Sequence, residues 1–275
     1  MKKYCIIFIL SFLTGGMLTA QEKEIDLFSV PLSNPNSPGK LVVNQISGSI
    51  MVEAYDGKEV IVKATVSNGR GRCSDCGNRR SDDKSGMKKI SNTSLNIGAE
   101  EDNNVVEIQN ELWNKKTDLF IKVPKDFSLK LKTINDGDIN VEGVNGEMEI
   151  SNINGEITLN DISGSVVANT TNGELTVSFN SITSGKDMAF SSFNGNVEVI
   201  FPQSLKANVK AKSDMGDVYT DFDMAISKNE PQVDQSNSSG KYRVKVEQWV
   251  KGTINGGGPE MLFKTFNGDI MIKSK

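Results

Sequence analysis

A glycine recurs every nine residues through the middle of the chain, and this spacing constrains the fold more than any other feature. The central set is Gly137, Gly146, Gly155, Gly164 and Gly173. Apolar residues follow each glycine at the second and fourth positions, as Ile157 and Leu159 follow Gly155. Such alternation is typical of a strand with one buried face, and a short fixed repeat is typical of units that bury a core only by stacking. The sequence therefore predicts a β-solenoid.

The repeat extends well beyond this central set, from Gly39 to Gly268. At three positions where the repeat would place a glycine, nine residues before the next repeat glycine, the sequence has another residue. These residues are Lys186, Ala207 and Pro259. The remaining repeat glycines are Gly39, Gly48, Gly57, Gly195, Gly216 and Gly268. We expect an all-β, single-stranded β-helix of about nine-residue rungs with parallel stacked strands. It should be right-handed, since crossovers between parallel strands strongly prefer that hand. Two rungs per coil would give an eighteen-residue period, and three rungs per coil remain open.

The first 20 residues have the plan of a secretory signal peptide. Lys2 and Lys3 precede an apolar stretch at 5–13, and small residues lead to a cleavage point after Ala20. The alternative is a retained anchor, for which the stretch is short. No later segment is apolar enough to span a bilayer. We therefore expect an exported protein, which is periplasmic, outer-membrane associated or extracellular.

The rest of the chain divides into a capping segment at 21–38 and the solenoid at 39–275. The capping segment is expected to contain one strand, at 25–30. Two polar intervals, 67–89 and 224–240, predict loops. Further strands are expected at 90–97, 104–109, 118–123 and 242–250. The asparagines that precede many of the glycines are expected to stack as hydrogen-bonded ladders.

The interval at 67–89 is basic and contains a cysteine pair. After removal of the leader, Cys73 and Cys76 are the only cysteines, and the chain has no histidine. In an exported protein this pair predicts a local disulfide, because four-ligand zinc would need carboxylates and a redox motif normally opens a helix. Four arginines form a possible contact loop for phosphates or acidic glycans, namely Arg70, Arg72, Arg79 and Arg80. The alternative, which we favour, is a solvated hairpin excursion.

Composition removes several function classes. A net charge of −4 argues against a general nucleic-acid binder. The absence of histidine excludes a Ser-His-Asp arrangement. Asp138, Glu156 and Glu174 would stack along one edge of an eighteen-residue coil, as a cation site, as glycosidase-type pairs or, as we favour, as a solvent-facing acidic stripe. We predict no catalytic, metal-binding or cofactor-binding residue and no cofactor.

Three groups of residues carry a family resemblance. They are the run from Leu119 to Pro124 leading into 129–133, the repeated Asn-Gly-[Asp/Glu]-Ile phrases, and the ending from Gly256 to Ile270. Over about residues 39–275 the chain resembles the bacterial exported putative-adhesin domain family, an uncharacterised β-solenoid group related to adhesin head domains. The resemblance implies a β-helical fold outside the cytoplasm.

The leading functional hypothesis is a non-enzymatic exported β-solenoid for adhesion or cell-envelope interaction. Its partner would be an envelope protein or a surface glycan, and its oligomeric state is open. One alternative is an exported carbohydrate-active enzyme on a solenoid scaffold. Another is a periplasmic structural or signalling module that binds another envelope protein.

Overall fold

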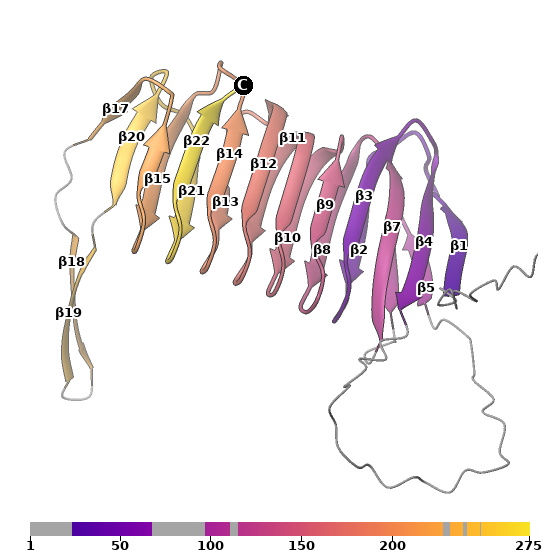
Figure 1. Ribbon diagram of the computed structural model, residues 1–275. Coiled ribbons are helices and arrows are strands. Elements are labelled where there is room, and N and C mark those ends of the chain that lie inside the picture. The colour runs from indigo at the N-terminus through magenta and orange to yellow at the C-terminus, as the bar shows by residue number, and fades with distance from the viewer. Residues whose placement is uncertain (1–23, 68–96, 111–114, 228–231, 239–240, 248) are drawn as a thin grey trace, which may run out of the picture.

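The computed structural model describes residues 24–67, 97–110, 115–227, 232–238, 241–247 and 249–275. Every regular element in these ranges is a β-strand, and none of them contains a helix long and apolar enough to cross a membrane. The all-β prediction is therefore confirmed. Figure 1 shows the strands side by side along one elongated body.

Twenty strands join into one hydrogen-bonded sheet, which runs along the body as two ladders. Ladder A contains, in spatial order, β5 (Ile97–Asp102), β6 (Val105–Asn110), β2 (Gly39–Asn44), β8 (Phe127–Thr133), β10 (Asn145–Asn152), the second half of β11 (Ile157–Asn169), β13 (Met188–Ser191), β21 (Glu260–Thr265), β15 (Ala207–Ser213), β20 (Val250–Ile254) and β17 (Met224–Ile226). Ladder B contains β1 (Glu24–Pro31), β4 (Glu59–Ser67), β7 (Lys116–Pro124), β3 (Ile50–Tyr55), β9 (Ile139–Glu142), the first half of β11, β12 (Leu175–Ile182), β14 (Val197–Phe201), β22 (Ile270–Ser274) and β16 (Val218–Thr220). Because β11 belongs to both ladders, the sheet closes around the core almost as a barrel does.

From β9 to β12 in ladder B and from β10 to β11 in ladder A, nearly all residues pair with the residue 18 positions later. Ile139 pairs with Ile157, and Ile157 pairs with Leu175, all in parallel strands. One turn of the chain therefore contributes one strand to each ladder, and the pairing distance is twice the glycine spacing.

The order of the strands in space differs from their order in the sequence at both ends. Strands β2 and β3 lie between the pair β6 and β7 and the pair β8 and β9. Likewise, β21 and β22 lie between β13 and β14 on one side and β15 and β16 on the other. Antiparallel strands end both ladders at the N-terminal end of the body, namely β1 and β4 in ladder B and β5 in ladder A. At the other end, β20 and β17 end ladder A with antiparallel pairing, whereas β16 ends ladder B in parallel with β22. The repeat alone does not reveal this arrangement, because every rung carries the same pattern.

Inward-facing apolar side chains from both ladders form one continuous core. In the C-terminal half, Phe179 and Phe201 of ladder B stack with ring centroids 5.1 Å apart. Phe190 and Phe263 of ladder A stack at 5.2 Å, and Phe179 meets Phe190 edge-to-face at 6.3 Å across the core. Buried aromatic rings remove large apolar areas from water, so these contacts hold the two ladders together.

A row of glycines lies at the corner where the chain turns from ladder A into ladder B. A Cβ atom on Gly173 would overlap the carbonyl oxygen of Gly155, and one on Gly155 would overlap that of Gly137. The same crowding extends along the row Gly48, Gly137, Gly155, Gly173, Gly195, Gly268 and Gly216. Hydroxyl groups satisfy the crowded carbonyls, since Thr170 Oγ1 donates to the Gly155 oxygen at 3.0 Å.

The other repeat glycines lie elsewhere. Gly146 and Gly164 adjoin one another at the return corner, where a Cβ on Gly164 would overlap the Gly146 carbonyl. Gly39 lies against the Phe127 ring. Gly57 lies outside both rows, against the Tyr55 ring.

The prediction of a loop over 224–240 is wrong. Strand β17 pairs with β20, and β18 (Gln232–Ser238) forms an antiparallel hairpin with β19 (Lys241–Glu247). Polar sequence hid these strands, because backbone pairing in a hairpin does not require apolar residues at alternate positions. The single strand expected at 242–250 is divided between β19 and β20.

At the N-terminal end, β1 occupies the position of the strand expected at 25–30, and β6 and β7 occupy those expected at 104–109 and 118–123. The acidic strand β5 was not expected. It forms an antiparallel edge, where burial imposes less apolar alternation. The expected strand at 90–97 lies outside the described residues except for Ile97. The signal peptide at 1–20 and the loop at 67–89, apart from Ser67, also lie outside them.

Candidate functional site

The glycine corner carries a row of asparagines just before the glycines. Asn172 Nδ2 donates to Asn154 Oδ1 at 2.8 Å, and Asn194 Nδ2 donates to Asn172 Oδ1 at 2.8 Å. Asn154 makes the same bond to Asn135 at 3.0 Å. The expected amide ladder is therefore present, and it fixes the register of successive rungs at this corner.

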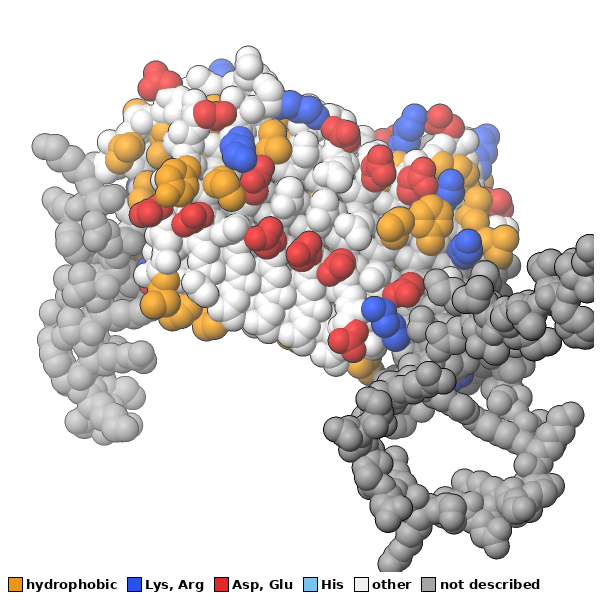
Figure 2. Space-filling view, in the orientation of Figure 1, with side chains coloured by type: hydrophobic (Ala, Val, Ile, Leu, Met, Phe, Trp, Pro, Cys, Tyr) orange, Lys and Arg blue, Asp and Glu red, His pale blue; other side chains and the backbone are white. Residues whose placement is uncertain are grey.

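The position after each corner glycine forms a second row, on the outer side of ladder B, and Asp118 extends the row although it follows Thr117 instead of a glycine. In spatial order its members are Asp118, Ser49, Asp138, Glu156, Glu174, Asn196, Asp269 and Asp217. We call this set the acidic row. Figure 2 shows acidic side chains in a line across this face of the body. The three carboxylates expected to stack, Asp138, Glu156 and Glu174, do lie on adjacent strands.

Several of these carboxylates bind backbone amides of a neighbouring rung. Asp138 Oδ1 accepts the Glu156 amide at 2.9 Å, and Asp269 Oδ1 accepts the Asp217 amide at 2.9 Å. Asp118 Oδ1 accepts the Ser49 amide at 3.0 Å. A charge-assisted bond of this kind links strands at the corner, so the row has a structural task.

The negative potential of the row acts on Tyr219, which lies at its C-terminal end. The charges of Asp217 and Asp269 raise the pKa of the Tyr219 phenol, because they oppose formation of a phenolate. The row lies along one line on an open face (Figure 2). Within the described ranges, no group of three or more His, Cys, Asp or Glu is arranged to hold a metal ion.

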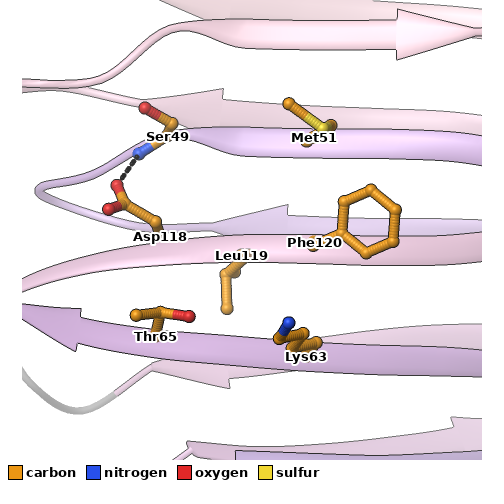
Figure 3. Close-up of a pocket in the computed structure, with 7 residues that line it drawn as sticks. All are labelled: Ser49, Met51, Lys63, Thr65, Asp118, Leu119 and Phe120. Atoms are coloured by element: carbon orange, nitrogen blue, oxygen red, sulfur yellow. Dashed lines mark hydrogen bonds between the residues drawn. The ribbon is translucent and has the colours of Figure 1, made fainter. Parts of the chain in front are cut away.

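A groove of about 370 Å³ opens on the outer face of ladder B near its N-terminal end. It is lined by Ser49, Met51, Lys63, Thr65, Asp118, Leu119 and Phe120. We call it the Phe120 groove. These residues come from β4 and β7 and from the rung that begins β3, and Figure 3 shows Met51 and Phe120 side by side with Lys63 beyond them. The register explains this, since Phe120 pairs with Met51 on one side and with Lys63 on the other.

The groove combines an apolar platform with polar edges. Met51 is 45% exposed and Phe120 is half-buried, although both lie on the solvent side of the sheet. Lys122 Nζ lies 5.7 Å from the Phe120 ring centroid and pairs with Glu53 at 3.4 Å. A second hollow of about 230 Å³ adjoins it and shares Met51 and Phe120. That hollow adds polar lining from Glu53, Asn140, Glu142 and Asn160.

Sequence reasoning missed this groove. A signal was present in Leu119-Phe120-Ile121, where three consecutive residues are apolar although only alternate ones face the core. The apolar residue at the outward position marks an exposed platform. The predicted contact residues Arg70, Arg72, Arg79 and Arg80 and the cysteines Cys73 and Cys76 lie outside the described residues, so the contact loop and disulfide stay predictions.

Residues 128–255 match the family model described as Toastrack DUF4097, which confirms the expected family resemblance over that segment. Among solved structures, the chain is similar to a putative cell adhesion protein from Clostridium sporogenes, with 14% identity, a TM-score of 0.44, and coverage of 92% of this chain and 100% of that chain. It is also similar to a putative adhesin from Bacteroides fragilis, with 11% identity, a TM-score of 0.35, and coverage of 92% of this chain and 98% of that chain. A third similar structure is a putative lipid binding protein from Parabacteroides distasonis, with 9% identity, a TM-score of 0.27, and coverage of 91% of this chain and 96% of that chain. No curated protein matches the chain.

Proposed function

We propose that this chain, which matches the Toastrack DUF4097 family over residues 128–255, is a non-enzymatic exported β-solenoid that binds a surface glycan in adhesion or cell-envelope interaction. In this proposal its coils are right-handed and its rungs about nine residues long. The observation that supports a glycan is the Phe120 groove, where an outward-facing ring and a methionine lie among carboxylate, hydroxyl and amine groups.

The groove matches the surface of a sugar ring. A pyranose presents an apolar C–H face and a polar hydroxyl edge, so its binding site needs both kinds of contact. Phe120 and Met51 offer the apolar surface, whereas Asp118, Thr65 and Lys63 offer hydrogen-bond partners at the rim. Asp118 retains acceptor capacity beyond the Ser49 amide, because an ionised carboxylate has two oxygens.

The acidic row supports binding over hydrolysis. Glycoside hydrolysis needs two carboxyl groups that flank one scissile bond, one of them as a general acid. Here Asp138, Asp269 and Asp118 accept backbone amides, and the row lies along a single open face. Carboxylates that accept these backbone hydrogen bonds stabilise the glycine corner.

The proposal is tested by glycan-array binding of residues 21–275. Phe120→Ala and Met51→Ala each remove part of the apolar platform, and we expect binding of the recognised glycan to fall about tenfold. Phe193→Ala is the matched control, because Phe193 is an aromatic residue 51% exposed on a different part of the surface. Undiminished binding by Phe120→Ala, or an equal loss with Phe193→Ala, would contradict the assignment.

A further inference from the structure

A second groove, of about 550 Å³, lies at the corner where the chain enters ladder A, towards the C-terminal end of the body. It is lined by Ile182, Ser184, Gly185, Ser204, Lys206, Gly257, Gly258 and Pro259. We call it the Lys206 groove. Three turns build it, between β12 and β13, between β14 and β15, and between β20 and β21. Their residues are far apart in the sequence and meet because β13, β21 and β15 are neighbours in ladder A.

Side-chain bonds to the backbone hold these turns in place. Asn255 Nδ2 donates to the Leu205 carbonyl at 2.8 Å and thereby ties two of the turns together. Asn208 Nδ2 donates to the Gly258 carbonyl. A Cβ atom on Gly258 would overlap the carbonyl oxygen of Lys206, so this close approach requires glycine. The groove is therefore a fixed surface with exposed backbone and two serine side chains.

Lys206 is the charged side chain of this lining, and none of the ion pairs formed among the described residues includes it. Two neighbouring side chains are held by other contacts. Lys186 pairs with Glu147 at 2.9 Å, and Asp187 Oδ1 accepts the Glu260 amide at 2.7 Å. The lining itself thus presents one cation beside neutral hydrogen-bonding groups, and the carboxylates of Asp187 and Glu260 lie just outside it.

The adjoining outer face of ladder A is also basic. Lys210 pairs across strands with Lys251, and Lys212 pairs with Lys264. Like charges directly opposite each other destabilise a sheet. Lys212 is offset by Asp214 at 3.1 Å. Lys210 and Lys251 therefore add positive charge to the face that adjoins the groove, which favours an anion.

We propose that the Lys206 groove binds a sugar that carries a carboxylate, sulfate or phosphate group. Lys206 supplies the charged donor for that group. Ser184, Ser204 and the exposed glycine backbone supply hydrogen bonds to hydroxyls, while Ile182 and Pro259 contact the C–H face of the ring. The volume lies within the range of small-ligand sites. This site is distinct from the Phe120 groove, since the two share no lining residue.

The test is an NMR titration of ¹⁵N-labelled residues 21–275 at low ionic strength with glucose 6-phosphate, glucuronate, glucose and inorganic phosphate. We expect the two anionic sugars to bind more tightly than glucose or phosphate, and to shift the amides of Gly185, Ser204 and Gly257. Lys206→Gln should weaken glucose 6-phosphate binding about tenfold, which is the loss expected for one charge-assisted bond. Lys206→Arg should retain most of it.

Two control variants distinguish an effect at the Lys206 groove from the effect of a charge change elsewhere and from an effect at the Phe120 groove. Lys132→Gln removes an exposed lysine elsewhere on ladder A and should leave binding unchanged. Phe120→Ala should also leave glucose 6-phosphate binding unchanged. The two proposals can therefore fail separately, because loss of glycan binding at the Phe120 groove leaves the Lys206 groove intact. Equal affinity for glucose would overturn the role of the anion, and equal affinity for inorganic phosphate would overturn the role of the sugar. Unchanged binding by Lys206→Gln would overturn the site.

Discussion

At the scale of single residues, the corner glycines are set by contact between neighbouring backbones. A side chain at Gly173 would meet the Gly155 carbonyl and the Glu156 amide, neither of which can move without shifting a whole rung. Gly98 on the edge strand β5 provides a contrast, because nothing lies within 4 Å of an added Cβ there. The same amino acid therefore has different tasks at the two positions.

The expected consequence is a large difference between two equivalent substitutions. Gly173→Ala should lower the free energy of unfolding by about 2 kcal/mol, because overpacking forces the backbone apart. Gly98→Ala should change it by less than about 0.5 kcal/mol, since that site is open. Urea denaturation followed by circular dichroism measures both. Similar losses for the two variants would show that the corner is not crowded in solution.

Tyr219 reports the electrostatics of the acidic row. Its pKa is raised first by Asp217 and then by Asp269, both of which disfavour the phenolate. Asp217→Asn removes the larger contribution and should lower the pKa of Tyr219 towards its usual value. Ultraviolet titration with Tyr219→Phe as the reference spectrum measures this. A pKa that stays constant or rises in Asp217→Asn would show that the charges do not act on this ring.

At the scale of elements, β1 protects an edge. It pairs with β4 along its whole length, from Glu24 with Val66 to Pro31 with Glu59. Without it, β4 would present unpaired backbone groups to solvent, and such an edge invites pairing with another chain. Pro31 makes β1 itself a poorer template for further pairing, since proline has no backbone N–H to donate.

Deletion of 21–38 should therefore increase self-association relative to residues 21–275. Sedimentation velocity over a range of concentrations measures the shift, and circular dichroism checks that the sheet persists. Removal of 21–23 alone is the control, since it leaves β1 intact. No increase in association by the folded deletion variant would contradict the protective role of β1.

The sequence predicted those strands in which apolar residues alternate with polar ones because one face of the strand is buried. Strands without this alternation were not predicted. Leu119, Ile121 and Val123 are buried on alternate positions of β7, so the pattern located that strand. Strands β5, β17 and β18 lack this alternation in sequence and were missed. The corner carboxylates Asp138 and Glu156 were placed correctly because their spacing equals one turn of the chain.

At the scale of the whole molecule, the binding surfaces depend on which rungs become neighbours. Phe120 and Met51 adjoin although many residues separate them, because the rung at 39–55 lies outside its sequence order. Lys206 and Gly258 meet for the same reason at the other end. A repeat that makes all rungs alike cannot specify such neighbours, so neither groove was visible in the sequence. We propose the two grooves as separate sites, one for an apolar sugar face and one for an anionic sugar.

We propose that this chain binds a glycan without cleaving it. The most direct test is incubation of residues 21–275 with a glycan that it binds through the Phe120 groove, followed by assay of reducing ends and mass spectrometry of the recovered glycan. We expect an intact glycan and no new reducing ends, with unchanged binding by Glu156→Gln. Release of reducing ends that Glu156→Gln abolishes would contradict it.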